Sequence, residues 1–365
     1  MKKSMFFMCK GFLLVLLFLG AGGVLFAQLT LNGGVQTGFM LALEDGDLTM
    51  FQTLNGTSTR YYATLTASGS HPSGNGGMNF VYTATNGTPG SSNGYIWYRP
   101  TPILTIYLGN GGGGGYATPG GVGANNEVGD GVGMTFRVNP PIDGFNFAFT
   151  VSPNTAGLGR ELTDARYSLG LAYSVGTVQM VANARYVGTT EQIHAAAGFN
   201  FTGLSDAGLT ALALDVSATN LTELTENGAV TVGPRVAFRA GSITGGLSGL
   251  VYVPIQEGQE LDFKVTANAS FPLALAVTGN VGVGYNLKGG IAPSADGGRF
   301  DYRYSDGIGS GMSSEETSSL GVQPWVEFTA FGGTLGVGYG LSAQFGGGND
   351  LKMKHAVYAN YSLGL

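Results

Sequence analysis

The sequence predicts a transmembrane, antiparallel, up-and-down β-barrel of about 18 strands. Three observations lead to this fold class. From Leu29 onward, the chain repeats segments of about ten residues in which apolar and polar side chains alternate. The breaks between these segments are alternately short and long. Charged residues make up only 11% of the chain, against about 25% in an average soluble domain, and glycine accounts for 64 of the 365 residues.

The first 27 residues differ from the rest and have the features of a secretory signal peptide. Their start is basic, with three lysines: Lys2, Lys3 and Lys10. A short apolar run at 12–19 and a group of small residues follow, which predicts export and cleavage after Ala27. An uncleaved anchor is the alternative, although the run is short for a span of about 20 residues. Residues 28–365 are then one barrel domain, which lacks cysteine because Cys9 is the only one.

The alternation is clearest in the second half of the chain. Residues 165–175 place apolar side chains on one face, and residues 178–186 do so again after a Gly176-Thr177 hairpin. The same rule holds for 192–201, 261–271 and 335–345. The opposite face carries small and polar residues, which suits a wet interior. Such strands separate lipid from water; a soluble sandwich or propeller is the alternative.

The breaks predict which end of the barrel faces outward. The short breaks fall at 68–76, 99–102, 139–144, 176–177, 204–208, 240–242, 271–273 and 332–333, of which 68–76 fits least well. The long or acidic breaks fall at 44–58, 86–93, 110–130, 153–163, 188–191, 221–227, 254–260, 287–319 and 347–350. Outer-membrane barrels have short periplasmic turns and longer outer loops. We therefore expect 18 strands, with 14 or 16 as alternatives, and both termini on the periplasmic side.

The charges support an apolar face that meets lipid, where a midplane Arg or Lys costs about 2–4 kcal/mol. Every charge assigned to a strand lies on the polar face, and these residues are the proposed pore lining: Arg60, Arg137, Arg166, Arg185, Arg235, Arg239, Lys264, Lys352, Lys354, Asp215, Asp262 and Glu327. The outer loops hold eighteen acidic and four basic residues. The net charge of −6, which becomes −9 without the signal lysines, therefore belongs to the loops. We expect a basic pore wall beneath an acidic rim.

This distribution predicts a porin-like channel for passive diffusion of small polar or anionic solutes. Inner charges that only neutralise one another are an alternative to anion preference. A further alternative is a non-conducting barrel that acts as an adhesin or surface antigen through acidic outer loops, chiefly 287–319. Within the third long break, Glu127 and Asp130 are candidates for a constriction that faces Arg60 and Arg137. Five consecutive glycines there are equally compatible with an external loop.

Two regions of the chain carry a family resemblance. The run YIWYRP at 95–100 precedes ILTIYLG at 103–109, and VNPPIDGF at 138–145 follows. They resemble spirochaetal, Treponema-like outer-membrane barrels of the porin type. The final strand is similar to the C-terminal assembly signal of such proteins, which usually ends in Phe; here its face carries Tyr361, Leu363 and Leu365. The resemblance implies outer-membrane lipid as surroundings, and chaperones and barrel assembly machinery as export partners. A homotrimer and a monomer both agree with it.

The sequence predicts no catalytic, cofactor or metal site. Its three histidines show no HExxH pattern, and there are no paired cysteines. The GxSxG match around Ser92 lies in a Gly/Ser loop instead of a strand-to-helix elbow, so a membrane-embedded hydrolase is the weakest alternative. The glycine run at 111–115 lacks the Lys-Ser/Thr of a phosphate-binding loop. No basic outer patch indicates nucleic-acid binding. We therefore expect neither enzymatic activity nor a cofactor.

Overall fold

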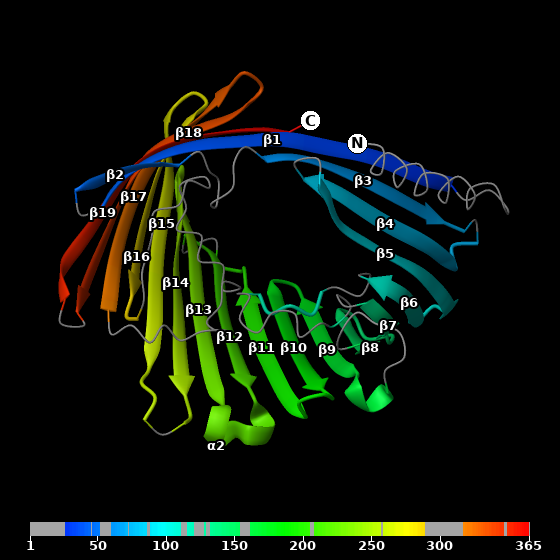
Figure 1. Cartoon of the computed structure of the whole chain (residues 1–365). Coiled ribbons are helices and arrows are strands. Elements are labelled where there is room, and N and C mark those ends of the chain that lie inside the picture. The colour runs from blue at the N-terminus through cyan, green and yellow to red at the C-terminus, as the bar shows by residue number, and fades with distance from the viewer. Residues whose placement is uncertain are drawn as a thin grey trace.

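The computed structural model describes residues 26–364, except 45, 52–59, 72, 86–87, 111–114, 120–127, 129–131, 154–160, 205–207, 257, 289–316 and 347–348. The described residues form a single antiparallel sheet that curves round on itself (Figure 1). Its strands are β1 (Phe26–Glu44), β2 (Asp47–Phe51), β3 (Arg60–Ser70), β4 (Gly76–Thr85), β5 (Thr88–Thr101), β6 (Leu104–Asn110), β7 (Val132–Val138), β8 (Phe145–Ser152), β9 (Arg166–Val175), β10 (Val178–Val187), β11 (Gln192–Phe201), β12 (Leu209–Thr219), β13 (Ala229–Ala240), β14 (Ile243–Pro254), β15 (Asp262–Ala274), β16 (Val277–Asn286), β17 (Thr317–Ala330), β18 (Gly333–Gly346) and β19 (Asn349–Gly364).

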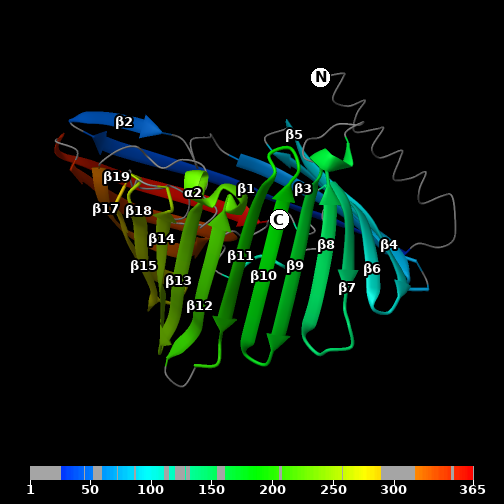
Figure 2. The ribbon, with the colours of Figure 1, turned by 90° about the horizontal axis from the view of Figure 1, so that it is seen from below.

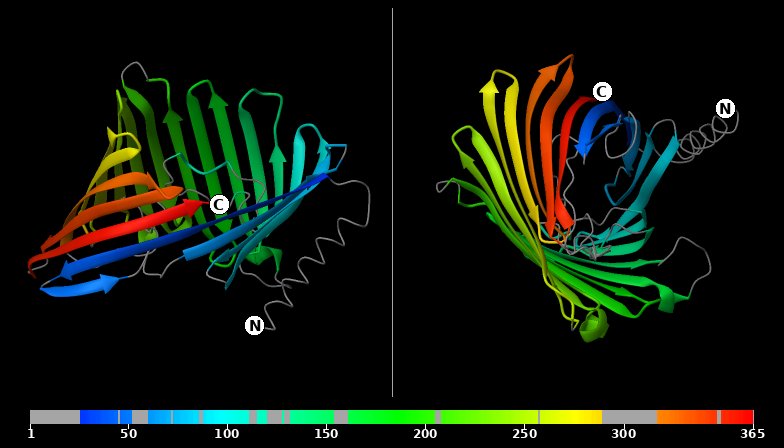
Figure 3. Two further views of the ribbon diagram at one scale, coloured as in Figure 1. Left: turned by 90° about the horizontal axis from the view of Figure 1, so that it is seen from above. Right: turned by 60° about the vertical axis from the view of Figure 1, so that its left-hand side comes forward.

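The sheet closes where the first strand meets the last. One edge of β1 pairs with β19, from Gly34 opposite Gly364 to Glu44 opposite Lys354. Its other edge pairs with β2 near one end and with β3 along the rest. Because β2 and β3 pair with different parts of the same edge of β1, they count as one strand of the barrel wall. The 19 described strand segments therefore make an 18-strand barrel. Figures 2 and 3 show the wall from other sides. The predicted fold class and strand number are confirmed.

The two ends of the barrel differ as predicted. One end has short turns, among them 71–75, 102–103, 176–177 and 241–242. The other end bears the long connections at 111–131, 153–165 and 287–316. The poorly fitting break at 68–76 is a short turn, in which the His71 amide donates to the Gly76 carbonyl (2.8 Å). Three short helical segments lie at the long-loop end: η1 (Leu162–Asp164), η3 (Leu221–Glu223) and α2 (Leu224–Asn227). No helix among the described residues is long and apolar enough to cross a membrane.

Three predicted breaks are wrong in position. The first hairpin is tight, because Glu44 pairs with Asp47 inside the predicted loop 44–58. Likewise β5 begins at Thr88, opposite Thr85, so most of 86–93 is strand. These segments pair through their backbones, which does not require apolar side chains. The turn predicted at 271–273 lies at 275–276 instead. Pro272 stays within β15 beside a register shift, where a missing N–H is tolerated.

The burial pattern is the reverse of that in a soluble protein. On β9, Leu169 and Leu171 are 45% and 39% exposed, whereas Ser168 on the same strand is 1% exposed. The buried strand residues are mostly alanine or polar, for example Thr105, Thr135, Thr150, Asn183, Asp215 and Gln323. Large apolar side chains therefore point outward and polar ones point inward, as in a barrel with lipid outside and water inside.

Candidate pore and its inner wall

The predicted pore-lining charges share a face with small and polar residues. Residues directly opposite each other on neighbouring strands point to the same side of a sheet. The pairs are Arg137 with Thr105 and Ala148, Arg185 with Ser168 and His194, and Arg235 with Ala213 and Ser248. Arg166 begins β9 opposite Ser152, and Lys264 lies opposite Leu250 and Asn286. These basic residues therefore lie on the inner face, as their sequence positions indicate.

Exposure differs among these basic residues. Arg235 and Arg239 on β13 and Lys352 on β19 are exposed, whereas Arg137 is only partly exposed and its Nε atom is buried. Five predicted site side chains fall outside the description. Glu127, Asp130 and Leu365 lie outside the described residues altogether, and for Arg60 and Lys354 only the side chains are outside the description. The basic side chains most accessible to a solute thus lie on β13 and β19.

The three inner acidic residues are held by local contacts. Asp262 accepts a hydrogen bond from the Lys288 amide (3.1 Å), and the Lys288 ammonium pairs with Glu260 (3.0 Å). Glu327 accepts from the Asn280 amide group (3.4 Å). Asp215 is fully buried and lies over Gly198, beside Pro119. Among the described residues, no group of three or more His, Cys, Asp or Glu side chains could hold a metal ion.

A segment of the third long loop, residues 115–119, lies against the inner wall. Tyr116 is 2% exposed and packs with Val128, Ala148, Ala172 and Val181. The last three belong to β8, β9 and β10, and they alternate with outward-facing apolar residues. The described part of this loop is therefore inside the barrel, not external to it.

Two glycines and one amide on the wall fit this segment closely. A Cβ atom at Gly170 would lie 2.5 Å from the Tyr116 ring, and one at Gly198 would lie 2.9 Å from Pro119. The Asn183 side-chain amide donates to the Tyr116 carbonyl (2.7 Å). The two glycines therefore leave the space that the segment 115–119 occupies. The Asn183 side chain provides a hydrogen bond for a backbone carbonyl of that segment.

The Tyr116 hydroxyl is buried and has no hydrogen-bond partner among the described residues. Burial raises the pKa of Tyr116 to about 12, although the nearby Arg137 charge acts in the opposite direction. The side chain is consequently uncharged at neutral pH. It covers part of the wall as an apolar ring.

An aromatic patch on the inner face was not predicted from the sequence. Tyr95 and Tyr107 meet edge to face with ring centroids 5.7 Å apart, and the Arg99 guanidinium lies 5.6 Å from the Trp97 ring. Trp325, 4% exposed, also shares the inner face of its strand with Glu327. The alternation of Trp97 with the exposed Ile96 and Tyr98 is the signal that places it inside.

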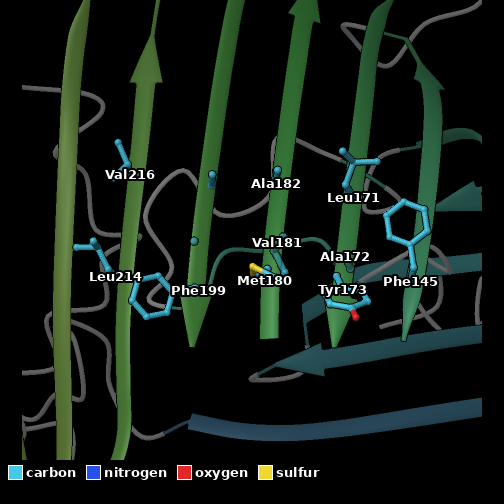
Figure 4. A pocket seen from close by; sticks show the side chains of 12 residues that line it. Phe145, Leu171, Ala172, Tyr173, Met180, Val181, Ala182, Phe199, Leu214 and Val216 are labelled. Atoms are coloured by element: carbon cyan, nitrogen blue, oxygen red, sulfur yellow. The ribbon is translucent and has the colours of Figure 1, made fainter. Parts of the chain in front are cut away.

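The outer face of strands β8–β12 contains an apolar hollow of about 430 Å³ (Figure 4). Small side chains, Ala182 opposite Ala197, form its floor. Larger side chains surround them: Phe145, Leu171, Tyr173, Met180, Phe199, Leu214 and Val216. The wall is thus lined by small residues on both faces in this region, with Tyr116 on the inner side.

The C-terminal residues predicted to form an assembly signal lie at the closing seam. Leu363 and Tyr361 on β19 are opposite Val35 and Thr37 on β1. The Tyr361 hydroxyl also donates to the Phe331 carbonyl (2.9 Å). Both residues therefore contribute to the join between the last strand and its neighbours.

Comparison with known proteins identifies the fold through solved structures alone, since no family model and no curated protein sequence matches the chain. OpdQ from Pseudomonas aeruginosa matches with a TM-score of 0.53 at 10% identity, over 93% of this chain and 98% of that one. OpdL from the same organism matches with a TM-score of 0.53 at 9% identity, over 93% and 99%. The outer membrane protein OprD, also from Pseudomonas aeruginosa, matches with a TM-score of 0.53 at 11% identity, over 92% and 94%.

Proposed function

We propose that this chain, which shares its fold with the outer membrane protein OprD over nearly its whole length, is a channel of the bacterial outer membrane. It lets small polar solutes diffuse passively and favours anions. The observation that carries this proposal is a closed 18-strand wall with apolar side chains outside and polar side chains inside. Barrels of 16–18 strands leave an aqueous interior, so diffusion needs no further chemistry.

The preference for anions rests on the basic residues of the inner face. Arg235 and Arg239 are exposed there, whereas the inner acids Asp215, Asp262 and Glu327 are engaged by neighbouring groups. A cationic wall lowers the energy of an anion in the pore and raises that of a cation. The segment 115–119 narrows the lumen on the side of β8–β12, so solutes pass closer to the opposite wall.

The route to the membrane is also a proposal. A signal peptide at 1–27 directs export, and cleavage follows Ala27. Periplasmic chaperones and barrel assembly machinery then recognise the C-terminal strand, and both termini lie on the periplasmic side. The relation to spirochaetal barrels is a proposal that rests on sequence resemblance alone, in the β5–β6 hairpin and the turn at 138–145. The oligomeric state is either a homotrimer or a monomer, and a measurement of the native mass of the protein in detergent distinguishes them.

Planar bilayer recording tests the channel. Folded, heat-modifiable protein is expected to give stepwise conductance and a reversal potential that indicates anion preference in a salt gradient. Replacing Arg137 and Arg235 with Ser is expected to move the reversal potential towards cations. Absence of conductance steps from folded protein would refute the channel and favour the adhesin alternative. An unchanged reversal potential in the variant would refute the basic wall.

A further inference from the structure

Two turns at the short-turn end expose large apolar side chains almost completely. Leu275 is 98% exposed at the tip of the β15–β16 hairpin, and Phe331 is 94% exposed at the tip of the β17–β18 hairpin. Leu273, close to the first tip, is 56% exposed. Figures 1 and 3 show the two hairpins, coloured yellow and orange, projecting side by side at one end of the barrel. We call these two turns, with Leu273, Leu275, Ala276 and Phe331, the apolar tips.

The apolar tips differ in chemistry from other turns at the same end. Residues 271–279 and 328–337 contain no charged side chain. The β9–β10 turn, Gly176-Thr177, and the β13–β14 turn, Gly241-Ser242, are also uncharged, but they have no large apolar side chain. Turns that lie in water favour Gly, Asn, Asp and Ser. A Leu-Ala and a Phe-Gly turn therefore indicate surroundings other than water.

The backbone at the apolar tips adopts a conformation that favours glycine. Ala276 and Phe331 have φ angles of 59° and 53°, in the left-handed region. A residue other than glycine in a sparsely populated region costs on the order of 1–3 kcal/mol, and such strain suggests a function for the side chain that is kept there. Glycine at position 331 would remove both the strain and the apolar ring.

The turn carbonyls are hydrogen-bonded to neighbouring strands instead of depending on water. The Ala276 carbonyl accepts from the Thr329 amide of the adjacent hairpin (3.3 Å). The Phe331 carbonyl accepts from the Tyr361 hydroxyl of β19 (2.9 Å). In lipid, an unsatisfied backbone group costs several kcal/mol. These two contacts remove that cost for the carbonyls of the two strained residues.

We propose that the apolar tips insert into the lipid leaflet at the short-turn end and anchor this side of the barrel there. The apolar outer face continues along the strands to the tips without a polar border, through Phe271 and Val277 on one hairpin and Phe328 and Leu335 on the other. A soluble partner protein is the competing occupant. Protein interfaces usually have a polar rim around their apolar core, and the apolar tips have no charged residue to form one.

Spin labelling of single cysteines tests this inference, because the chain without its signal peptide has no cysteine of its own. Leu275→Cys and Phe331→Cys place a nitroxide at each tip, and Thr177→Cys places one at the polar β9–β10 tip as a matched control. Each variant is reconstituted in vesicles of phosphatidylethanolamine and phosphatidylglycerol with no other protein. Relaxation by oxygen reports contact with lipid, and relaxation by a water-soluble nickel complex reports contact with water.

The labels at 275 and 331 are expected to be relaxed more by oxygen than by nickel, with the order reversed at 177. Only heat-modifiable preparations are compared, so that misfolded protein does not contribute. If the labels at 275 and 331 behave like the label at 177, the lipid anchor is wrong, and the apolar tips are a surface for a protein partner. Loss of conductance would refute the channel proposal without affecting this measurement on folded protein.

Discussion

Two stretches of the inner wall use the same alternation to different effect. Along β8–β12, the inner side chains Ala148, Ala172, Val181 and Asp215 are buried, and the segment 115–119 lies over them. On β13, the inner side chains Arg235 and Arg239 remain exposed. The comparison teaches that an inward position does not by itself make a residue accessible to solute. A pore lining depends on what the loops leave uncovered.

The largest expected effect separates the exposed from the partly buried arginines. Arg235→Ser should shift ion selectivity towards cations more than Arg137→Ser does, because each variant removes one charge and the Arg235 side chain is exposed whereas that of Arg137 is only partly exposed. A unit charge about 4 Å from an ion in water is worth about 1 kcal/mol, or about a fivefold change in permeability ratio. Reversal potentials at low salt, where screening is weak, measure this. Equal shifts from the two variants would contradict the division of the wall into covered and open stretches.

The next effect concerns the close packing of the segment 115–119 against Gly170 on β9. Gly170→Ala would place a methyl group 2.5 Å from the Tyr116 ring and should displace the segment 115–119. Overpacking of this kind costs about 1–3 kcal/mol, and a displaced segment widens the pore. Single-channel conductance should therefore rise. Gly246→Ala is the matched control, since its Cβ would have its nearest neighbour, the Val236 carbonyl, at 3.2 Å. Similar conductance in both variants would show that Gly170 does not seat the segment.

A smaller effect is expected from the hydrogen bond that holds the same segment. Asn183→Ala removes the donor to the Tyr116 carbonyl. Leaving a buried acceptor unsatisfied costs about 1–3 kcal/mol, without the steric collision of the glycine variant. Conductance should fluctuate more between levels, with a smaller rise in the mean. Asn268→Ala on β15, where the side chain is exposed, serves as control, and an equal response there would argue against the Asn183 contact.

The smallest effect is expected at the Tyr116 hydroxyl. Tyr116→Phe removes a buried hydroxyl that has no partner among the described residues, so stability should change by less than about 1 kcal/mol. The temperature of the heat-modifiable transition measures this. In an alkaline ultraviolet titration, the variant should lose one tyrosine that ionises near pH 12. A loss of several kcal/mol would mean that the hydroxyl has a hydrogen bond that supports the segment.

The strands with strict alternation were predicted closely from the sequence. β11 was expected at 192–201 and is found at Gln192–Phe201, and the turn at 176–177 is confirmed. The turns of the β1–β2 and β4–β5 hairpins were predicted as loops that are too long. The sequence is acidic at 44–47 and rich in Gly, Ser and Asn at 86–93, and both compositions are typical of loops. The turn after β15 was misplaced, because Pro272 looks like a break whereas Leu275-Ala276 does not.

The covered stretch was beyond prediction for a different physical reason. Whether residues 115–119 lie inside depends on space over Gly170 and Gly198 and on the amide of Asn183, which belong to strands far along the chain. In a glycine-rich sequence, nothing marks two glycines as the ones that receive a tyrosine and a proline. The inner position of Trp97 was available from its alternation with the apolar residues Ile96 and Tyr98.

The seam between β1 and β19 has a consequence for the order of assembly. Every other neighbouring pair of positions in the wall is consecutive along the chain, whereas this pair joins its two ends. Hairpins form locally, but the seam requires loop closure over almost the entire polypeptide, and such distant contacts form slowly. Until the last strand arrives, the edge of β1 from Gly34 to Glu44 has unpaired amides and carbonyls that can pair with another chain. The first strand made is thus the last to be completed, and it is the segment most in need of protection during biogenesis.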